Sequence, residues 1–326
     1  MNSPLGNLPA NIPATQPEAM LAPHCSEATG PQLAPKLTPT KSVASSSEQV
    51  FSSLTGRIAL NQLTTFRNSL SADLAEYRRH QVPAIGLNWQ KLVREGLRRS
   101  LRKIQSSNLP VSSIGWIGGF TGEHGHTLSD AVQDAKKIIR FAGQVRAKTV
   151  TVITGPQAGH IRSHAVRITC DTLRVLSDFA ANYNVTLALQ PMHAMYAKSW
   201  TFLNSLDDAL LILDRVNHPY LQLAFGTYHL WEEPNLLQRL PEVARRIQLV
   251  TLADWGPVPR HEQDRLLPGE GELPLSSTVH ALEANGFSGW YELEVWSRDL
   301  WKLESRDLMR KCSAARQLLS SVPATF

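Results

Sequence analysis

Side chains that transfer protons or bind polar ligands recur in four short segments of the second half of this 326-residue sequence. These segments read LALQPMHAMYAKSW, LQLAFGTYHLWEEP, LVTLADWGPVPRHEQDR and GWYELEVWS. Imidazole and carboxylate groups exchange protons near neutral pH and bind metal ions, and arginine holds hydroxyl or anionic groups. The combination predicts a site for a metal ion or a polyol, with groups that are able to move a proton.

The elements that would position these segments alternate along the chain. Short apolar runs rich in β-branched residues are separated by longer stretches of helical period, which indicates repeated βα units around a parallel sheet. The predicted strands are Arg57 to Gln62, Pro83 to Asn88, Val111 to Gly115, Thr149 to Thr154, Thr186 to Gln190, Leu221 to Phe225, Gln248 to Leu252 and Trp290 to Val295. The predicted helices are Ser71 to His80, Lys91 to Ser106, Leu128 to Arg146, Ser163 to Tyr183, Ser205 to Val216, Leu236 to Arg246, Leu275 to Asn285 and Ser305 to Leu319. Eight strands, each followed by a helix, over about 270 residues predict an α/β fold, a single (β/α)₈ TIM barrel.

A barrel of this kind carries its reactive groups at the carboxyl ends of the strands. Gln190 and His193 follow the fifth predicted strand, and Glu292 and Glu294 share one face of the eighth. We expect one of these glutamates to point into the barrel with the other nearer its bottom, or both to face the outer helices. An open doubly wound sheet is the structural alternative, but no GxGxxG turn follows the first strand.

The first fifty residues differ from the rest in composition. They hold eight of the 20 prolines, no Phe, Trp or Tyr, and only five charged residues. Such a stretch buries too little apolar surface to offset its ordering entropy. We therefore expect residues 1–50 to form a disordered tail and residues 51–326 to form one barrel domain.

Charge and cysteine content narrow the class of protein. The net charge of +5 favours anionic ligands without demanding nucleic acid. The three cysteines, Cys25, Cys170 and Cys312, show no CxxC spacing, so the sequence predicts neither a disulfide framework nor a cysteine zinc site. No uncharged apolar run has the length of a membrane span. We expect a soluble, cytoplasmic protein with no membrane partner.

The strand endings resemble a known family. Together with the downstream DR…PGEGE turn and the opening run Asn61-Gln62-Leu63-Thr64-Thr65, they are similar to the xylose isomerase-like barrels of the sugar phosphate isomerases and epimerases. The similarity extends from about Arg57 to Leu319. It implies a divalent ion such as Mn²⁺ or Mg²⁺, held by two glutamates, an aspartate and a histidine, and proton transfer between adjacent carbons through an enediolate.

Three of the four implied metal ligands are substituted. Gln190 stands where the resemblance implies a glutamate, Gly226 where it implies an aspartate, and Thr251 where it implies a histidine, and only Glu294 is retained. An amide and a hydrogen atom thus replace two anionic ligands, which predicts a weak site and no tightly bound metal. Gln190 also cannot accept a proton.

The residues that the family uses around its substrate are better preserved. The resemblance assigns substrate binding to His193, Trp231, Asp254 and Arg265 and catalysis to Glu294 and His229. Glu294 would act as a base and His229 as an acid or electrophile, while Trp231 offers an aromatic face for a sugar ring.

Two classes of function follow. The first is an isomerase or epimerase that binds a sugar or sugar phosphate at the barrel mouth, with the family reaction weakened or lost. In that case Glu123, His124, His126 or His160 would supply replacement metal ligands, although GEHGH is more typical of a glycine-rich loop. The second is a non-catalytic sugar-binding or regulatory protein that keeps the pocket. Sequence leaves turnover and the identity of the sugar open.

Two partners remain to be weighed. Lys91, Arg94, Arg98 and Arg102 follow one another at intervals of three or four residues and form a cationic stripe that would suit phosphate, but such a stripe is more typical of a solvated helix face. Nucleic-acid processing is therefore the remote alternative. Exposed tryptophans in the last two βα units would favour a homodimer.

Overall fold

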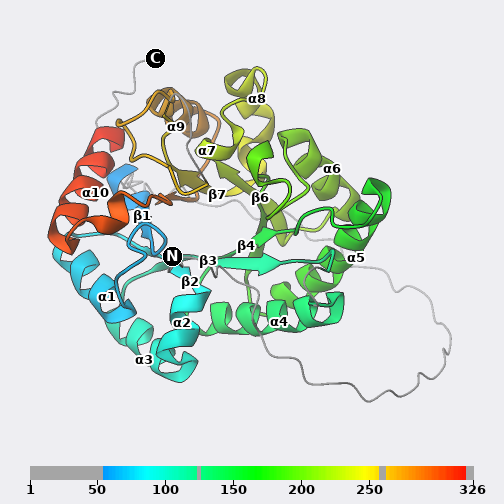
Figure 1. The fold of residues 1–326 in the computed structure, drawn as a ribbon, viewed down its shortest axis with the longest axis horizontal. Helices are drawn as coiled ribbons and strands as arrows, with labels where there is room; N and C mark the ends of the chain where they lie inside the picture. Colours follow the sequence, from blue (N-terminus) through cyan, green and yellow to red (C-terminus); the bar gives the residue numbers. More distant parts are fainter. Residues whose placement is uncertain (1–53, 123–125, 257–261, 321–326) are drawn as a thin grey trace, which may run out of the picture. The chain divides into compact units, whose positions relative to one another are not determined.

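The computed structural model describes residues 54–122, 126–256 and 262–320. Eight parallel strands close into a barrel in the order β1 to β8, and the helices surround it (Figure 1). The strands are β1 Ile58–Asn61, β2 Ile85–Asn88, β3 Val111–Gly118, β4 Thr149–Ile153, β5 Thr186–Leu189, β6 Leu221–Gly226, β7 Ile247–Leu252 and β8 Trp290–Leu293. The predicted TIM barrel is confirmed, and each predicted strand overlaps an observed one. Residues 1–50 lie outside the described residues, so the tail and its boundary stay predictions.

The helices depart from the prediction in two places, over residues 91–106 and in an additional short helix at Thr227–Leu230. They are α1 Leu70–Arg79, α2 Trp89–Glu95, α3 Leu97–Ser107, α4 Leu128–Gln144, α5 Arg162–Ala181, α6 Leu206–Val216, α7 Thr227–Leu230, α8 Leu236–Val243, α9 Leu275–Ala284 and α10 Ser305–Ser320. The single helix predicted over Lys91 to Ser106 is wrong, because Gly96 adopts φ +91° between α2 and α3. None of the helices in these ranges is both long and apolar enough to cross a bilayer.

The cationic stripe is interrupted as well. Lys91 is buried, and its ammonium group lies 3.1 Å from the carboxylate of Asp73 in α1. The Lys91 ammonium also donates to the carbonyl of Thr65, and Gln62 donates to the same Asp73 oxygen. This buried cluster ties α1 and α2 to the loop after β1. It withdraws Lys91 from any outer phosphate-binding face.

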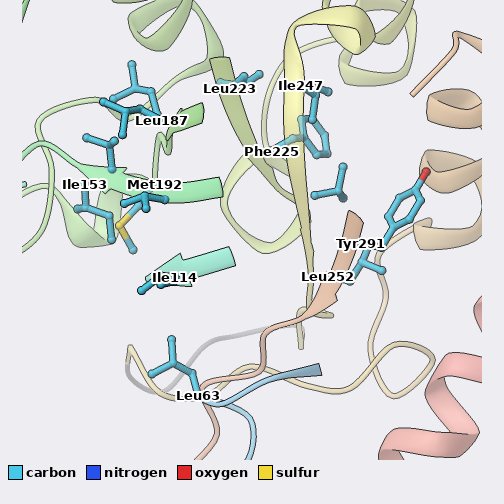
Figure 2. Close-up of a cluster of buried hydrophobic side chains, with 14 of the residues drawn as sticks. Leu63, Ile114, Ile153, Leu187, Met192, Leu223, Phe225, Ile247, Leu252 and Tyr291 are labelled. Atoms are coloured by element: carbon cyan, nitrogen blue, oxygen red, sulfur yellow. The ribbon is translucent and has the colours of Figure 1, made fainter. Parts of the chain in front are cut away.

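Apolar side chains fill the layer between the strands and the helices. Figure 2 shows this packing, with Ile114 of β3, Leu223 of β6 and Tyr291 of β8 among the buried residues. Tyr291 points away from the barrel, and its hydroxyl donates to Glu283 of α9. Since successive residues of a strand face opposite sides, Glu292 must face the barrel interior.

Glu292 occupies a polar layer inside the barrel. Its carboxylate accepts hydrogen bonds from Ser112 at 2.5 Å and from Asn61 at 2.7 Å. A Cβ atom on Gly86 would lie 2.5 Å from this carboxylate, so glycine is what makes room for it. Glu294, two residues on, shares the inward face nearer the carboxyl end. Both glutamates therefore point inward at two levels, which excludes the expectation that both face the helices.

Candidate active site

The four positions that the sequence singles out as metal ligands lie at the carboxyl ends of four adjacent strands. Gln190 and Glu294 directly follow β5 and β8, Gly226 ends β6, and Thr251 lies in β7. Gly226 and Thr251 are paired across β6 and β7. The side chains of Gln190, Thr251 and Glu294 are buried.

Arg265 occupies the centre of this region. Its Nη1 atom lies 3.2 Å from Glu294 Oε1, and its Nη2 atom lies 3.2 Å from His229 Nε2. The side chain is only 1% exposed. The structure thus brings together three of the predicted site residues, Glu294, His229 and Arg265, in one buried cluster.

Three aromatic rings enclose the guanidinium of Arg265. Its carbon atom lies 4.2 Å from the ring centre of Trp296, 4.8 Å from that of Tyr228 and 5.9 Å from that of Tyr196. These distances suit cation–π attraction, which strengthens when the cation is removed from water. The sequence prediction did not include these rings in the site. Their only signal is position, since each lies within three residues of Glu294, His229 or His193.

His229 is held as a neutral imidazole. Burial, and then the charges of Arg265 and His193, keep its pKa well below the usual value for histidine. The Arg265 guanidinium can only donate, so His229 Nε2 accepts this hydrogen bond. This geometry favours a role for His229 as a hydrogen-bond acceptor that orients Arg265. It does not favour the role as an acid that the sequence led us to expect.

Glu294 has the properties of a base that works near neutral pH. Burial raises the pKa of Glu294 to about 7, against the opposing effect of the Arg265 charge, and the neighbouring carboxylate of Glu292 adds to the rise. A base is most effective when its pKa lies near the working pH. Its role as the catalytic base stays a prediction.

Gly226 leaves no room for the side chain that a ligand would need. A Cβ atom built there would lie 2.9 Å from His229 Cδ2 and 3.1 Å from Thr251 Oγ1. The first distance is shorter than real Cβ contacts, so a larger residue would have to move the imidazole. His229 therefore occupies the space beside Gly226.

His193 and Trp231 lie farther from the centre. His193 Nδ1 accepts from the Met195 amide, which leaves Nε2 to donate to Glu232 at 2.7 Å. Trp231 packs against Trp255 with ring centres 4.9 Å apart. It also lines a groove of about 420 Å³ between α8 and the loop before α9. Direct contact of His193 and Trp231 with a ligand stays a prediction.

Asp254 shapes the glycine-rich turn. Its Oδ2 atom accepts hydrogen bonds from the amides of Gly269 and Gly271, and its Oδ1 atom accepts from those of Trp255 and Leu273. Four backbone donors thus surround one carboxylate. The DR…PGEGE pattern therefore has a local structural basis, and substrate contact by Asp254 stays a prediction.

The replacement metal ligands are only partly visible. Glu123 and His124 lie outside the described residues. His160 Nε2 lies 2.8 Å from the carbonyl of Thr121, and the His160 ring packs against that of His164. In the described ranges, no three His, Cys, Asp or Glu side chains are arranged to hold a metal ion.

Comparison with known proteins places this geometry in context. A family model described as xylose isomerase-like TIM barrel matches residues 69–312. An inosose isomerase of Bacillus velezensis is 19% identical over 276 residues, which are 81% of this chain and 97% of that protein. An inosose isomerase of Bacillus subtilis is 23% identical over 154 residues, and this match spans 46% of this chain and 54% of that protein.

Solved structures show the same barrel. Protein SMc04130 of Sinorhizobium meliloti superposes with a TM-score of 0.76 at 22% identity, over 81% of this chain and 98% of that one. The IOLI protein, solved with a bound zinc atom, superposes with a TM-score of 0.72 at 20% identity, again over 81% and 98%. At such identities the likeness concerns the fold.

Proposed function

The chain belongs to the xylose isomerase-like TIM barrel family, and we propose that it binds a sugar or sugar phosphate at the carboxyl-terminal mouth of the barrel. The family's metal-dependent isomerisation is weakened or lost. The observation that carries the proposal is the ion pair between Arg265 and Glu294, because it engages the one carboxylate retained at the four ligand positions.

The ligand class rests on the residues of the mouth and on the relatives. Arg265 and His193 are polar groups that suit hydroxyl or phosphate oxygens, and aromatic faces are available for stacking on a sugar ring. Two Bacillus relatives are inosose isomerases. A small polyol is the ligand that fits both features.

The donor set does not fit a tightly held divalent ion. Mg²⁺ and Mn²⁺ favour carboxylate oxygens, and Glu294 is the one carboxylate at the four positions, where it is already paired with Arg265. Gly226 supplies no side-chain donor, and Gln190 and Thr251 supply neutral oxygens. Zinc is bound in the IOLI protein, but these substitutions argue against the same ion here.

Without a metal ion, the side chains of the site can still bind a ligand and hold a proton. Arg265 offers hydrogen-bond donors to an oxygen of the ligand, and His229 orients them. Glu294 has a pKa of about 7 and can accept a proton from a carbon next to a carbonyl. Gln190 cannot return a proton from the opposite side, so turnover that needs two bases would be slow.

A non-catalytic sugar-binding protein is the second candidate. It is favoured by the closure of the centre, since Arg265 and Tyr196 are almost fully buried. Isothermal titration with a panel of ketoses, inososes and sugar phosphates, paired with an isomerisation assay, separates the two. We expect binding, with turnover that is slow or absent and not increased by Mn²⁺ or Mg²⁺. Lack of binding by every compound would contradict the proposed function.

A further inference from the structure

The centre of the barrel mouth contains a positive charge of its own. The Arg265 guanidinium contacts Glu294, one of the four ligand positions, and His229, which lies against Gly226. Gly226 is in turn paired with Thr251 across β6 and β7. A single chain of contacts from Arg265 therefore reaches three of the four positions where the family implies metal ligands.

The site is built to retain this charge. A buried cation is stable only where partners replace its hydration. Arg265 has the carboxylate of Glu294 on one side and the rings of Trp296 and Tyr228 within 5 Å, at 4.2 and 4.8 Å. These contacts are specific to a planar guanidinium, which stacks on rings and donates from its edges.

The backbone that carries Arg265 is also fixed. The Arg265 amide donates to the carbonyl of Trp296, just past β8, and Leu266 exchanges two hydrogen bonds with Asp254, just past β7. The segment is therefore attached beside two strands of the barrel. Arg265 is held in place from both directions and is not a surface side chain that folds inward by chance.

The substitution at Gly226 and the placement of Arg265 are coupled through His229. The imidazole lies where a side chain at position 226 would begin, and its Nε2 atom accepts from Arg265. Restoring an aspartate at 226 would displace the ring that orients the guanidinium. His229 therefore links the space at position 226 to the orientation of Arg265.

We propose that the guanidinium of Arg265 takes the place of the divalent cation at this centre and acts as a permanent internal positive charge that is paired with Glu294. This inference rests on the proposed function, because it concerns the same mouth. Arg265 Nε is buried and has no hydrogen-bond partner within the described residues. With Nη2 it forms one edge of the guanidinium, a two-donor fork that suits a carbonyl or carboxylate oxygen of the ligand.

Metal uptake tests the inference directly. The variants are the triple Gln190→Glu, Gly226→Asp, Thr251→His with Arg265 retained, and the same triple with Arg265→Ala added. Zn²⁺ or Mn²⁺ bound after dialysis is measured by elemental analysis, and affinity by calorimetry. We expect the quadruple variant to bind at least about tenfold more tightly, because a guanidinium within about 4 Å repels a divalent ion. Equal affinity of the triple and quadruple variants would overturn the inference.

The wild-type chain provides a test that does not depend on the folding of the multiple variants. We expect the wild-type protein to hold no stoichiometric Zn²⁺ or Mn²⁺ at Glu294. If the wild-type protein binds stoichiometric metal and the Glu294→Gln variant loses it, the inference is overturned. The Glu294→Gln variant is the matched control, because metal held elsewhere would persist in it. Sugar titration is scored separately: absence of sugar binding contradicts the proposed function while leaving the metal result to stand.

Discussion

The imidazole of His229 lies against Gly226, so close that a Cβ atom on the glycine would approach His229 Cδ2 to 2.9 Å. Gly226 has φ −104°, a value that any residue adopts, so space and not backbone conformation demands glycine here. The ring of His229 thus fills the volume in which the family resemblance implies an aspartate.

Substitution of Gly226 tests this packing. We expect Gly226→Ala to lower the free energy of unfolding by about 1–3 kcal/mol, because the added methyl group overpacks a buried site. Urea denaturation measures the change. In a His229→Ala background the contact with the ring is absent and only the 3.1 Å approach to Thr251 Oγ1 remains, so the same substitution should cost less than it does with His229 present. An equal loss in both backgrounds would mean that the imidazole is not the obstacle.

The ion pair between Arg265 and Glu294 is expected to show strong coupling. Arg265→Met removes the cation and leaves a buried carboxylate without its partner, which should lower the free energy of unfolding by about 3–5 kcal/mol. Glu294→Gln in the same chain should recover part of this loss, because the uncompensated charge is then absent. A double-mutant cycle by chemical denaturation measures the coupling, and additive effects would argue against the pair.

The pH dependence of stability should report the titration of Glu294. Its pKa rises from the ordinary 4.5 to about 7 on folding, mainly through burial. Between these values the folded state binds more protons than the unfolded state. The contribution of Glu294 is thus fully present below pH 4.5 and is lost as the pH rises through 7. The difference in the free energy of unfolding between wild type and Glu294→Gln, measured by urea denaturation, should decline in this way as the pH rises. A difference that stays constant between pH 4 and 8 would refute the pKa shift.

The sequence predicts the barrel well because each strand carries its own local signal. The short run of β-branched and aliphatic residues before Gln190 and the aromatic and aliphatic residues before Glu294 are visible without any knowledge of contacts. Local spacing fails for Lys91, which the helical spacing of the cationic stripe places on an outer face. The structure buries it beside Asp73, a partner 18 positions away in the chain.

The sequence also predicts part of the site, because some site residues are marked by their position directly after a strand. Glu294, His229 and Arg265 are found from their places after the strands. The pairing of Arg265 with Glu294 joins residues 29 positions apart and depends on how the loop after β7 returns to β8. No periodic pattern encodes such a return. The enclosing ring of Trp296 escapes prediction because a tryptophan at a barrel rim is as often a packing or oligomer contact.

The buried pair between Lys91 and Asp73 should stabilise the fold away from the site. Burial raises the pKa of Asp73 and lowers that of Lys91, although each charge partly offsets the effect on the other. We expect Asp73→Asn to lower the free energy of unfolding by about 3–5 kcal/mol, since a buried ammonium is left without its counter-charge. Asp134→Asn, which breaks an i,i+3 pair with the exposed Lys137, is the control and should cost less than about 1 kcal/mol. Similar losses in both variants would contradict the role of burial.

Substitution of Asp254 separates a structural role from ligand contact. Asp254→Asn replaces one carboxylate oxygen by an NH₂ group, so two of the four backbone amides, either those of Gly269 and Gly271 or those of Trp255 and Leu273, lose their acceptor. Hydrogen bonds to a charged group contribute about 1.5–3 kcal/mol each, so stability should fall by several kcal/mol. Because Leu266 is bonded to Asp254, a disturbed turn should also displace Arg265 and weaken the binding of any sugar found by titration. Weaker sugar binding with unchanged urea denaturation would instead assign Asp254 to direct ligand contact.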